Sequence, residues 1–158
     1  MIKNILAGFG LVFILLILTV GFLYERWKSL DKTSYEYAMD SASFIFANWD
    51  FQELKNRADS RMFTNTDENT LKNTFAILSQ LGALQSVEGC EGQPAVSVGS
   101  GIVVTGKYVC QLKFQKDKVM ITFILSGNPD AILLLDNNNS WKILALNIDS
   151  DYLAKSVK

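Results

Sequence analysis

The chain begins with a long run of apolar side chains. Residues 5–24 form twenty consecutive positions without a charged side chain, and Lys3 is the one charged residue before them. At about 1.5 Å of rise per residue, a helix of this length spans roughly the 30 Å hydrocarbon core of a bilayer. The pattern predicts a short tail at residues 1–4 and a transmembrane helix at residues 5–24.

Two other interpretations fit this run less well. A cleaved signal peptide has a shorter apolar core of about 7–15 residues and a small-x-small cleavage site, but here Tyr24 is followed by Glu-Arg-Trp-Lys. A type IV pilin needs Glu at the fifth position of the processed helix, where cleavage after Gly8 would place Phe13. We therefore expect a permanent anchor in the lipid bilayer, with Tyr24 and Trp27 at the membrane interface.

The flanking charges leave two orientations open. Lys3 and the terminal amine lie on one side, and Arg26, Lys28 and Lys32 lie on the other. A count of Lys and Arg would place the domain in the cytoplasm, whereas a start-proximal helix with a four-residue tail typically leads to export of the downstream chain. We favour export, which predicts a single-pass protein of the bacterial inner membrane with a periplasmic domain.

After a juxtamembrane linker at residues 25–33, the apolar positions follow the helical period. Thr33 and Glu36 have the spacing of a capping box, which predicts a helix start. The face of this helix carries small and apolar residues: Ala38, Ser41, Ala42, Ile45 and Trp49. Asp50 with Glu53 resembles a second helix cap. Together these signals predict two helices within residues 34–62.

A third helix is predicted before the pattern changes. Thr64 or Thr66, followed by Asp67, marks its start, and Gly82 marks its end. Beyond it the apolar positions alternate with period two, which predicts strands. The inward rows are Tyr108, Cys110, Leu112 and Phe114, then Val119, Ile121, Phe123 and Leu125. Residues 132–135 and 141–148 predict a final hairpin, so that residues 34–158 form one α+β domain with an antiparallel meander.

The amino-acid composition argues against several classes of function. Beyond the anchor the chain has 16 acidic and, without Lys3, 14 basic residues, a balance that offers no basic surface for nucleic acid. It contains no histidine and two cysteines, so neither a zinc site nor a histidine-based catalytic triad is expected. We expect no metal and no cofactor.

The order of these segments resembles a known family. The segments that carry the resemblance are Trp49-Asp50 with Leu54, Leu81-Gly82, Tyr108 with Phe114, and 140–143 running to Asn147-Ile148. They resemble the cystatin/nuclear transport factor 2-like cone, also called the ketosteroid-isomerase-like fold, and within it small bacterial envelope proteins with an N-terminal anchor. The resemblance implies three helices packed on a curved antiparallel sheet. It says little about activity, because this fold hosts enzymes, carriers and scaffolds alike.

Acid–base catalysis is the chemistry that the family resemblance keeps open, because enzymes on this cone use a carboxylate and hydroxyl donors in its mouth. The residues of suitable type are Asp40, Asp50, Glu53, Tyr35, Tyr37 and Tyr108. None of them aligns with the catalytic positions of the isomerase. Capping of the second helix is a sufficient structural role for Asp50 and Glu53. Asp40 is expected on a solvated helix face. We expect a protein that is not an enzyme.

Cys90 and Cys110 predict a disulfide. In an exported domain an even pair of cysteines indicates a disulfide. A hairpin that reverses at Ser100 also pairs residues whose numbers sum to 200, which places the two cysteines opposite each other. The alternatives are two thiols in a reduced compartment, or a turn at Thr105-Gly106, which would break this register.

The remaining candidates concern association. Phe44 and Phe46 lie off the main helical stripe, and Ile124, Ile132 and Leu134 leave the outer sheet face partly apolar. These five residues predict an interaction surface for a homodimer or another envelope protein. The leading hypothesis is a membrane-anchored, non-enzymatic interaction or assembly domain, for instance an accessory subunit of a membrane complex. The alternative is a binder of a small apolar ligand, or an isomerase- or dehydratase-like enzyme, that uses an open cone pocket.

Overall fold

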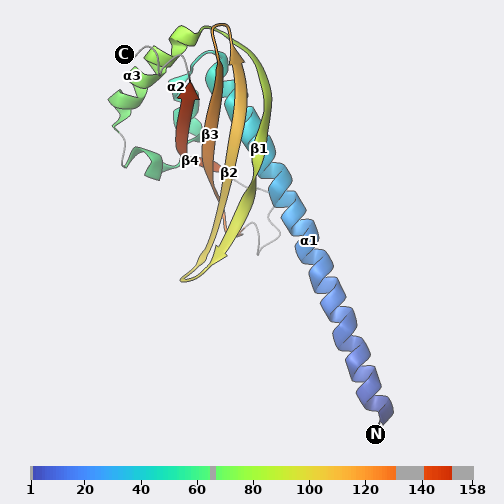
Figure 1. Ribbon diagram of the computed structural model, residues 1–158. Coiled ribbons are helices and arrows are strands. Elements are labelled where there is room, and N and C mark those ends of the chain that lie inside the picture. The colour runs from blue at the N-terminus through green and yellow to red at the C-terminus, as the bar shows by residue number, and fades with distance from the viewer. Residues whose placement is uncertain (1, 65–66, 131–140, 151–158) are drawn as a thin grey trace.

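Three helices precede a four-stranded antiparallel sheet in the computed structural model (Figure 1). It describes residues 2–64, 67–130 and 141–150, with side chains from residue 13 onward. The elements are α1 (Ile2–Ala47), α2 (Phe51–Arg57), α3 (Glu68–Leu78), β1 (Leu84–Val98), β2 (Ile102–Phe114), β3 (Lys118–Gly127) and β4 (Lys142–Ser150). Short 3-10 helices lie at Ser60–Phe63 and Ser79–Leu81. The predicted α+β class, with three helices and a curved antiparallel sheet, is confirmed.

Helix α1 is one continuous helix of 46 residues. The expected helix start at Thr33 is therefore wrong, and residues 25–33, expected as a juxtamembrane linker, are part of the helix. Residues 25–33 contain neither Gly nor Pro, so no residue there interrupts the helix. The hydroxyl of Thr33 instead donates a hydrogen bond to the carbonyl oxygen of Leu30 inside the helix, at 3.2 Å. What changes near Leu30 is packing: Leu30 is buried, whereas residues 13–25 are all exposed.

The sheet is a simple meander in the order β1-β2-β3-β4. Strands β1 and β2 reverse at 99–101, where Gly99 N–H donates to the carbonyl oxygen of Gly101 at 3.0 Å. Cys90 lies opposite Cys110, as the register centred on Ser100 predicts, and Thr105-Gly106 lies within β2. Strand β4 pairs with β3 through residues 142–150. The predicted strand at 132–135 lies outside the described residues.

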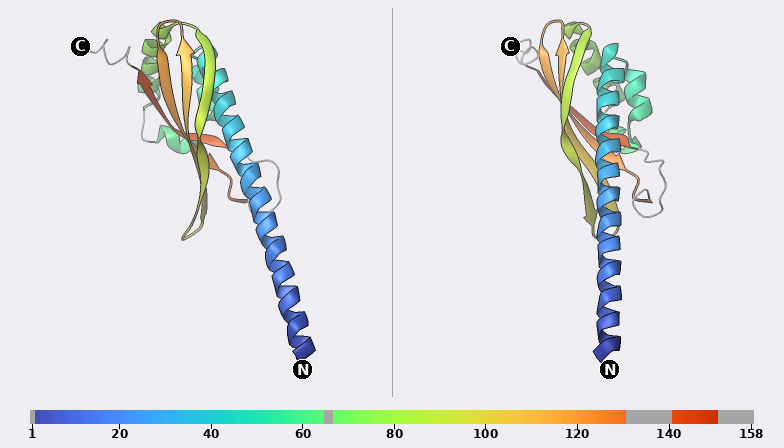
Figure 2. Two further views of the ribbon diagram at one scale, coloured as in Figure 1. Left: turned by 45° about the vertical axis from the view of Figure 1, so that its right-hand side comes forward. Right: turned by 90° about the vertical axis from the view of Figure 1, so that its right-hand side faces the viewer.

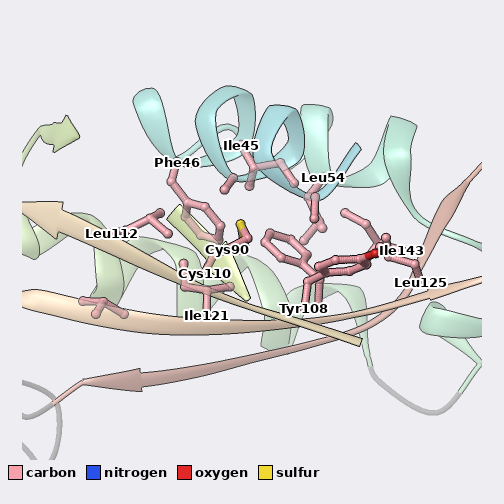
Figure 3. Close-up of a cluster of buried hydrophobic side chains, with 14 of the residues drawn as sticks. Ile45, Phe46, Leu54, Cys90, Tyr108, Cys110, Leu112, Ile121, Leu125 and Ile143 are labelled. Atoms are coloured by element: carbon pink, nitrogen blue, oxygen red, sulfur yellow. A yellow bond between two sulfur atoms is a disulfide. The ribbon is translucent and has the colours of Figure 1, made fainter. Parts of the chain in front are cut away.

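The core lies between α1, α2, α3 and the inner face of the sheet (Figure 3). The predicted inward rows of β2 and β3 are buried, and so are the small residues of α1 that face them. Small side chains at Ala38, Ser41 and Ala42 let the helix approach the sheet closely. The predicted helical face is therefore confirmed for Ala38, Ser41, Ala42 and Ile45, whereas Trp49 lies beyond Ala47, the last residue of α1.

The helix ends follow the capping signals. The carboxylate of Asp50 accepts hydrogen bonds from the backbone N–H groups of Gln52 (2.8 Å) and Glu53 (3.2 Å). Asp67 caps α3 in the same way and is its N-cap, rather than either threonine considered from sequence. Gly82 ends the following 3-10 turn with φ of 86°, a conformation that favours glycine.

Candidate interaction surfaces

The N-terminal half of α1 projects away from the domain (Figures 1 and 2). Residues 13–25 are all exposed, and apart from Glu25 none of them is charged. Tyr24 and Trp27, predicted to lie at a membrane interface, are 65% and 45% exposed. The guanidinium carbon of Arg26 lies 5.2 Å from the centre of the Phe22 ring. Most of the exposed large hydrophobic side chains among the described residues lie between Phe13 and Trp27.

A membrane-crossing helix is not found among the described residues: none of their helices is both long and apolar enough to span a bilayer.

Phe44, one of the predicted interaction residues, is exposed on α1, but it is not isolated. Its ring lies 4.9 Å from the guanidinium carbon of Arg57, which also lies 5.8 Å from the ring of Tyr37. Glu53 holds the Arg57 side chain through an ion pair of 2.5 Å. The Tyr37 hydroxyl donates to the carbonyl oxygen of Arg57 at 3.0 Å, and burial raises the pKa of this tyrosine. Phe44 therefore joins a mixed cation–aromatic patch between α1 and α2.

Phe46 is not a surface residue, so its assignment to an interaction surface is wrong. Its side chain is fully buried. Its ring stacks on Phe75 of α3 with 5.9 Å between centroids, and contacts Trp49 edge-on and Phe123 of β3. Helix α1 is apolar on more than one side because α3 covers a second side of it. The additional apolar face has an intramolecular partner.

The outer face of the sheet is a second candidate surface. Ile124 is half-buried there, and Met120 is 52% exposed. Two shallow depressions hollow this face, and Val109 lines both of them. Glycines at 89, 92 and 106 are among the residues that line these depressions. At Gly92 an added Cβ would lie only 2.0 Å from the carbonyl oxygen of Lys107. Ile132 and Leu134 lie outside the described residues.

The residues considered for acid–base catalysis lie in different surroundings. Tyr108, the tyrosine of the inward row, is fully buried, and its hydroxyl lies 2.6 Å from that of Ser34. Burial raises the pKa of Tyr108, against the opposing effect of this hydrogen bond. Tyr35 contacts its ring edge-on, and both Tyr35 and Asp40 are exposed. Asp50 and Glu53, the other acidic candidates, are used by the α2 cap and the Arg57 ion pair.

Metal ligands are not gathered anywhere in the described part of the chain. No group of three or more Asp, Glu or Cys side chains there could hold a metal ion.

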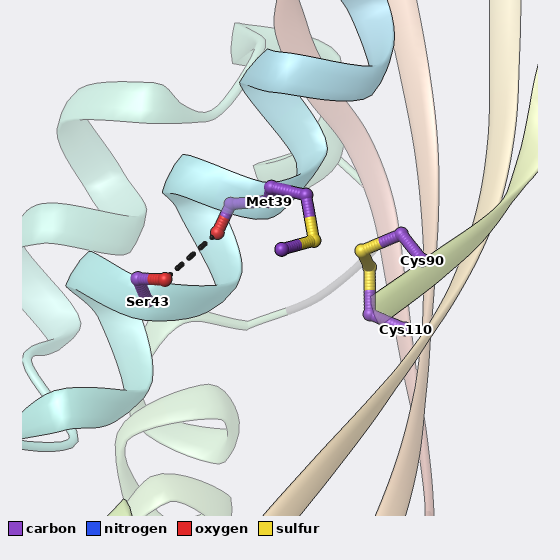
Figure 4. Close-up of a disulfide and its surroundings, with 4 residues drawn as sticks. All are labelled: Met39, Ser43, Cys90 and Cys110. Carbon is purple, nitrogen blue, oxygen red and sulfur yellow. Dashed lines mark hydrogen bonds between the residues drawn. A yellow bond between two sulfur atoms is a disulfide. The ribbon is translucent and has the colours of Figure 1, made fainter. Parts of the chain in front are cut away.

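Cys90 and Cys110 form a disulfide between β1 and β2, and this prediction is confirmed (Figure 4). Cys110 is fully buried and Cys90 is 8% exposed. Met39 of α1 points toward the disulfide in Figure 4. The link closes a separation of 20 residues, for which about 3 kcal/mol of stabilisation is expected. It therefore ties together the two strands of the long hairpin.

Three contacts that join distant segments were not foreseen from sequence. Trp141 donates from Nε1 to the Thr33 hydroxyl at 3.2 Å, Trp49 donates from Nε1 to the Gly82 carbonyl oxygen at 3.2 Å, and Ser34 bonds Tyr108. Each partner lies more than 30 residues away in the chain, and such pairings leave no local signal.

No protein-family model matches this chain, and no curated protein or solved structure is significantly similar to it.

Proposed function

We propose that this protein is a membrane-anchored, non-enzymatic interaction domain of the bacterial cell envelope. Residues 5–24 would cross the inner membrane once, and the domain would face the periplasm. The observation that carries the proposal is the form of α1. Residues 13–24 are uncharged and exposed, while the C-terminal half of α1 is packed into the domain core, and the helix has no break between the two.

A continuous helix has a consequence for how such a domain would act. A flexible linker would let the domain reorient freely, whereas one helix transmits its direction to the core that packs on it. The domain would therefore stand in a defined orientation on the membrane. Restriction to a membrane surface also raises the local concentration of two such domains, which favours weak pairing.

The disulfide supports the periplasmic orientation. Structural disulfides persist in oxidising compartments and are rare in the cytoplasm. The Cys90–Cys110 link therefore fits export better than retention. The three-helix and curved-sheet arrangement also fits the cystatin/nuclear transport factor 2-like cone that we propose as the fold family.

The interaction role is preferred over a ligand-binding role because of the interior. Large side chains fill the space between the helices and the sheet: Phe46, Tyr108, Phe114 and Phe123 are all at most 2% exposed. The two depressions lie instead on the outer sheet face. We propose that this outer face, around Val109, Met120 and Ile124, pairs with a second copy of the chain.

Association can be tested with the full-length protein in detergent micelles. We expect a dimer by analytical ultracentrifugation, and a monomer for Met120→Asp with an unchanged circular dichroism spectrum. Asp40→Lys, a charge change on the exposed side of α1, is the matched control and should leave the dimer intact. A monomeric wild-type protein, or a Met120→Asp variant that still dimerises, would contradict pairing through this face.

A further inference from the structure

The hairpin of β1 and β2 extends beyond the rest of the sheet. These strands stay paired as far as Val98 and Ile102, whereas the last residue of β2 that pairs with β3 is Val104. Among the residues that the structure describes, 97–103 therefore form a two-stranded ribbon with no third strand paired beside it. In both Figures 1 and 2 this ribbon extends past the rest of the sheet on the side of the domain from which the N-terminal half of α1 projects, and in Figure 1 it diverges from that helix. We name residues 97–103 the hairpin tip.

The reach of the hairpin tip follows from the contact between Ser34 and Tyr108, which places α1 and β2 side by side. From Tyr108 to Ser100, eight residues of strand extend about 26 Å. Helix α1 covers the same distance in about 17 residues, counted from Ser34 toward the N-terminus. Because the two elements diverge (Figure 1), the tip reaches less far along the helix axis than these 17 residues, toward the end of residues 5–24 that is nearer the domain. The sequence places the membrane interface, with Tyr24, at that end.

The chemistry of the hairpin tip differs from that of the opposite end of the sheet. Residues 92–106 contain no charged side chain, whereas residues 113–118 include three lysines and an aspartate. Val98 is 81% exposed and Val103 is 52% exposed. Val98 pairs with Ile102, so Val103 lies on the other face of the ribbon. Apolar side chains on both faces suit immersion in lipid better than docking against a flat protein surface.

We propose that the hairpin tip enters the interfacial region of the same bilayer that holds residues 5–24. This inference rests on the proposed anchor. The exposed apolar side chains of Val98 and Val103 would reach the boundary of the acyl chains, and the hydroxyls of Ser97 and Ser100 would remain among the headgroups. The membrane would then hold the domain at two points, the α1 helix and the tip, and fix its rotation about the helix axis.

Fluorescence quenching by lipid tests the proposal. Single variants Ser100→Cys, Leu15→Cys and Lys113→Cys of the full-length protein are labelled with an environment-sensitive dye without reductant, so that the disulfide stays closed. The wild-type chain, treated in the same way, supplies the blank. Each protein is reconstituted in vesicles of equal parts phosphatidylcholine and phosphatidylglycerol that carry a nitroxide near the headgroup or near the chain end.

The expected result is shallow quenching of the dye at position 100, deep quenching at position 15 and none at position 113. Val98→Asp with Val103→Asp should abolish quenching at position 100, and should not unfold the domain because both side chains are exposed. Quenching at position 15 without quenching at position 100 would overturn the tip contact and leave the anchor standing. Absence of quenching at position 15 would overturn the anchor itself. A blue-shifted dye at position 100 that lipid does not quench would indicate a protein contact and would also overturn the proposal.

Discussion

The hydroxyl groups of Ser34 and Tyr108 lie 2.6 Å apart in the buried interface between α1 and β2. Ser34 also donates to the carbonyl oxygen of Leu30, one turn earlier in the helix, at 2.7 Å. This pair lies at the level where α1 leaves the domain. It therefore fixes the direction of the projecting half of the helix relative to the sheet.

Removing the Tyr108 hydroxyl should destabilise the fold less than removing the Ser34 hydroxyl. In Tyr108→Phe the Ser34 hydroxyl keeps its bond to Leu30, so we expect a loss of about 1 kcal/mol in the free energy of unfolding. In Ser34→Ala the Tyr108 hydroxyl is left buried without its partner, and we expect a larger loss, up to about 3 kcal/mol. Thermal unfolding followed by circular dichroism measures both. The reverse order of the two losses would contradict the assigned hydrogen bonds.

The disulfide should contribute strongly to stability. Cys90→Ser with Cys110→Ser should lose about 3 kcal/mol, because the unfolded chain regains the freedom that the closed loop removes. Dithiothreitol should lower the melting temperature of the wild-type protein and leave that of the double variant unchanged. Two thiols that react under denaturing conditions in unreduced protein would show that the link is absent.

Acid should weaken the contact between Asp59 and Arg61. Hydrogen bonds from Arg61 lower the pKa of the Asp59 carboxyl to about 2, from an ordinary 3.8. A lowered pKa in the folded state means that the stabilisation is fully present above about pH 4 and is lost as the pH falls through about 2. The pair lies at the surface, so its contribution should stay below about 1 kcal/mol.

Unfolding of Asp59→Asn, measured from pH 6 down to pH 2, checks this window. The difference in the free energy of unfolding between this variant and the wild type should be constant at the upper end of the pH range and should shrink toward the lower end. Arg61→Gln should behave in the same way, because it removes the other partner. A difference that grows as the pH falls would have the wrong sign for this assignment.

Phe44 and Phe46 should respond to substitution in opposite ways. Phe46→Ala empties a buried site between α3 and the sheet, so we expect a loss of about 3–5 kcal/mol. Phe44→Ala removes an exposed ring and its contact with Arg57, which should cost about 1 kcal/mol or less. Denaturant midpoints of the two variants measure the contrast. Equal losses would be inconsistent with a buried Phe46 and an exposed Phe44.

Local patterns predicted much of this fold. The alternation along β2 and β3 and the turn at Ser100 placed Cys90 opposite Cys110, because strand register follows directly from turn position. The cap at Asp50 was also visible, since it depends on neighbours within three residues, whereas the start of α3 was expected at Thr64 or Thr66 and lies at Asp67.

Other features depend on tertiary contacts and left no such signal. The capping-box spacing at Thr33 occurs inside a longer helix, where propagation is favourable and no Gly or Pro stops it. Phe46 was assigned to the surface because the pattern of a single helix does not reveal that α3 covers its second side. The direction in which the hairpin tip extends likewise depends on packing, although the absence of charged residues from the tip is visible in the sequence.

The central claim is tested most directly by labelling an added cysteine in intact cells. Lys113→Cys lies on the exposed end of β2 away from the hairpin tip, and the native cysteines are protected by their disulfide. A maleimide that cannot cross the inner membrane is applied to bacteria with a permeabilised outer membrane, and membranes are then washed with alkaline carbonate. The account predicts labelled protein that stays in the washed membranes. Labelling only after cell lysis, or release of the protein by carbonate, would contradict it.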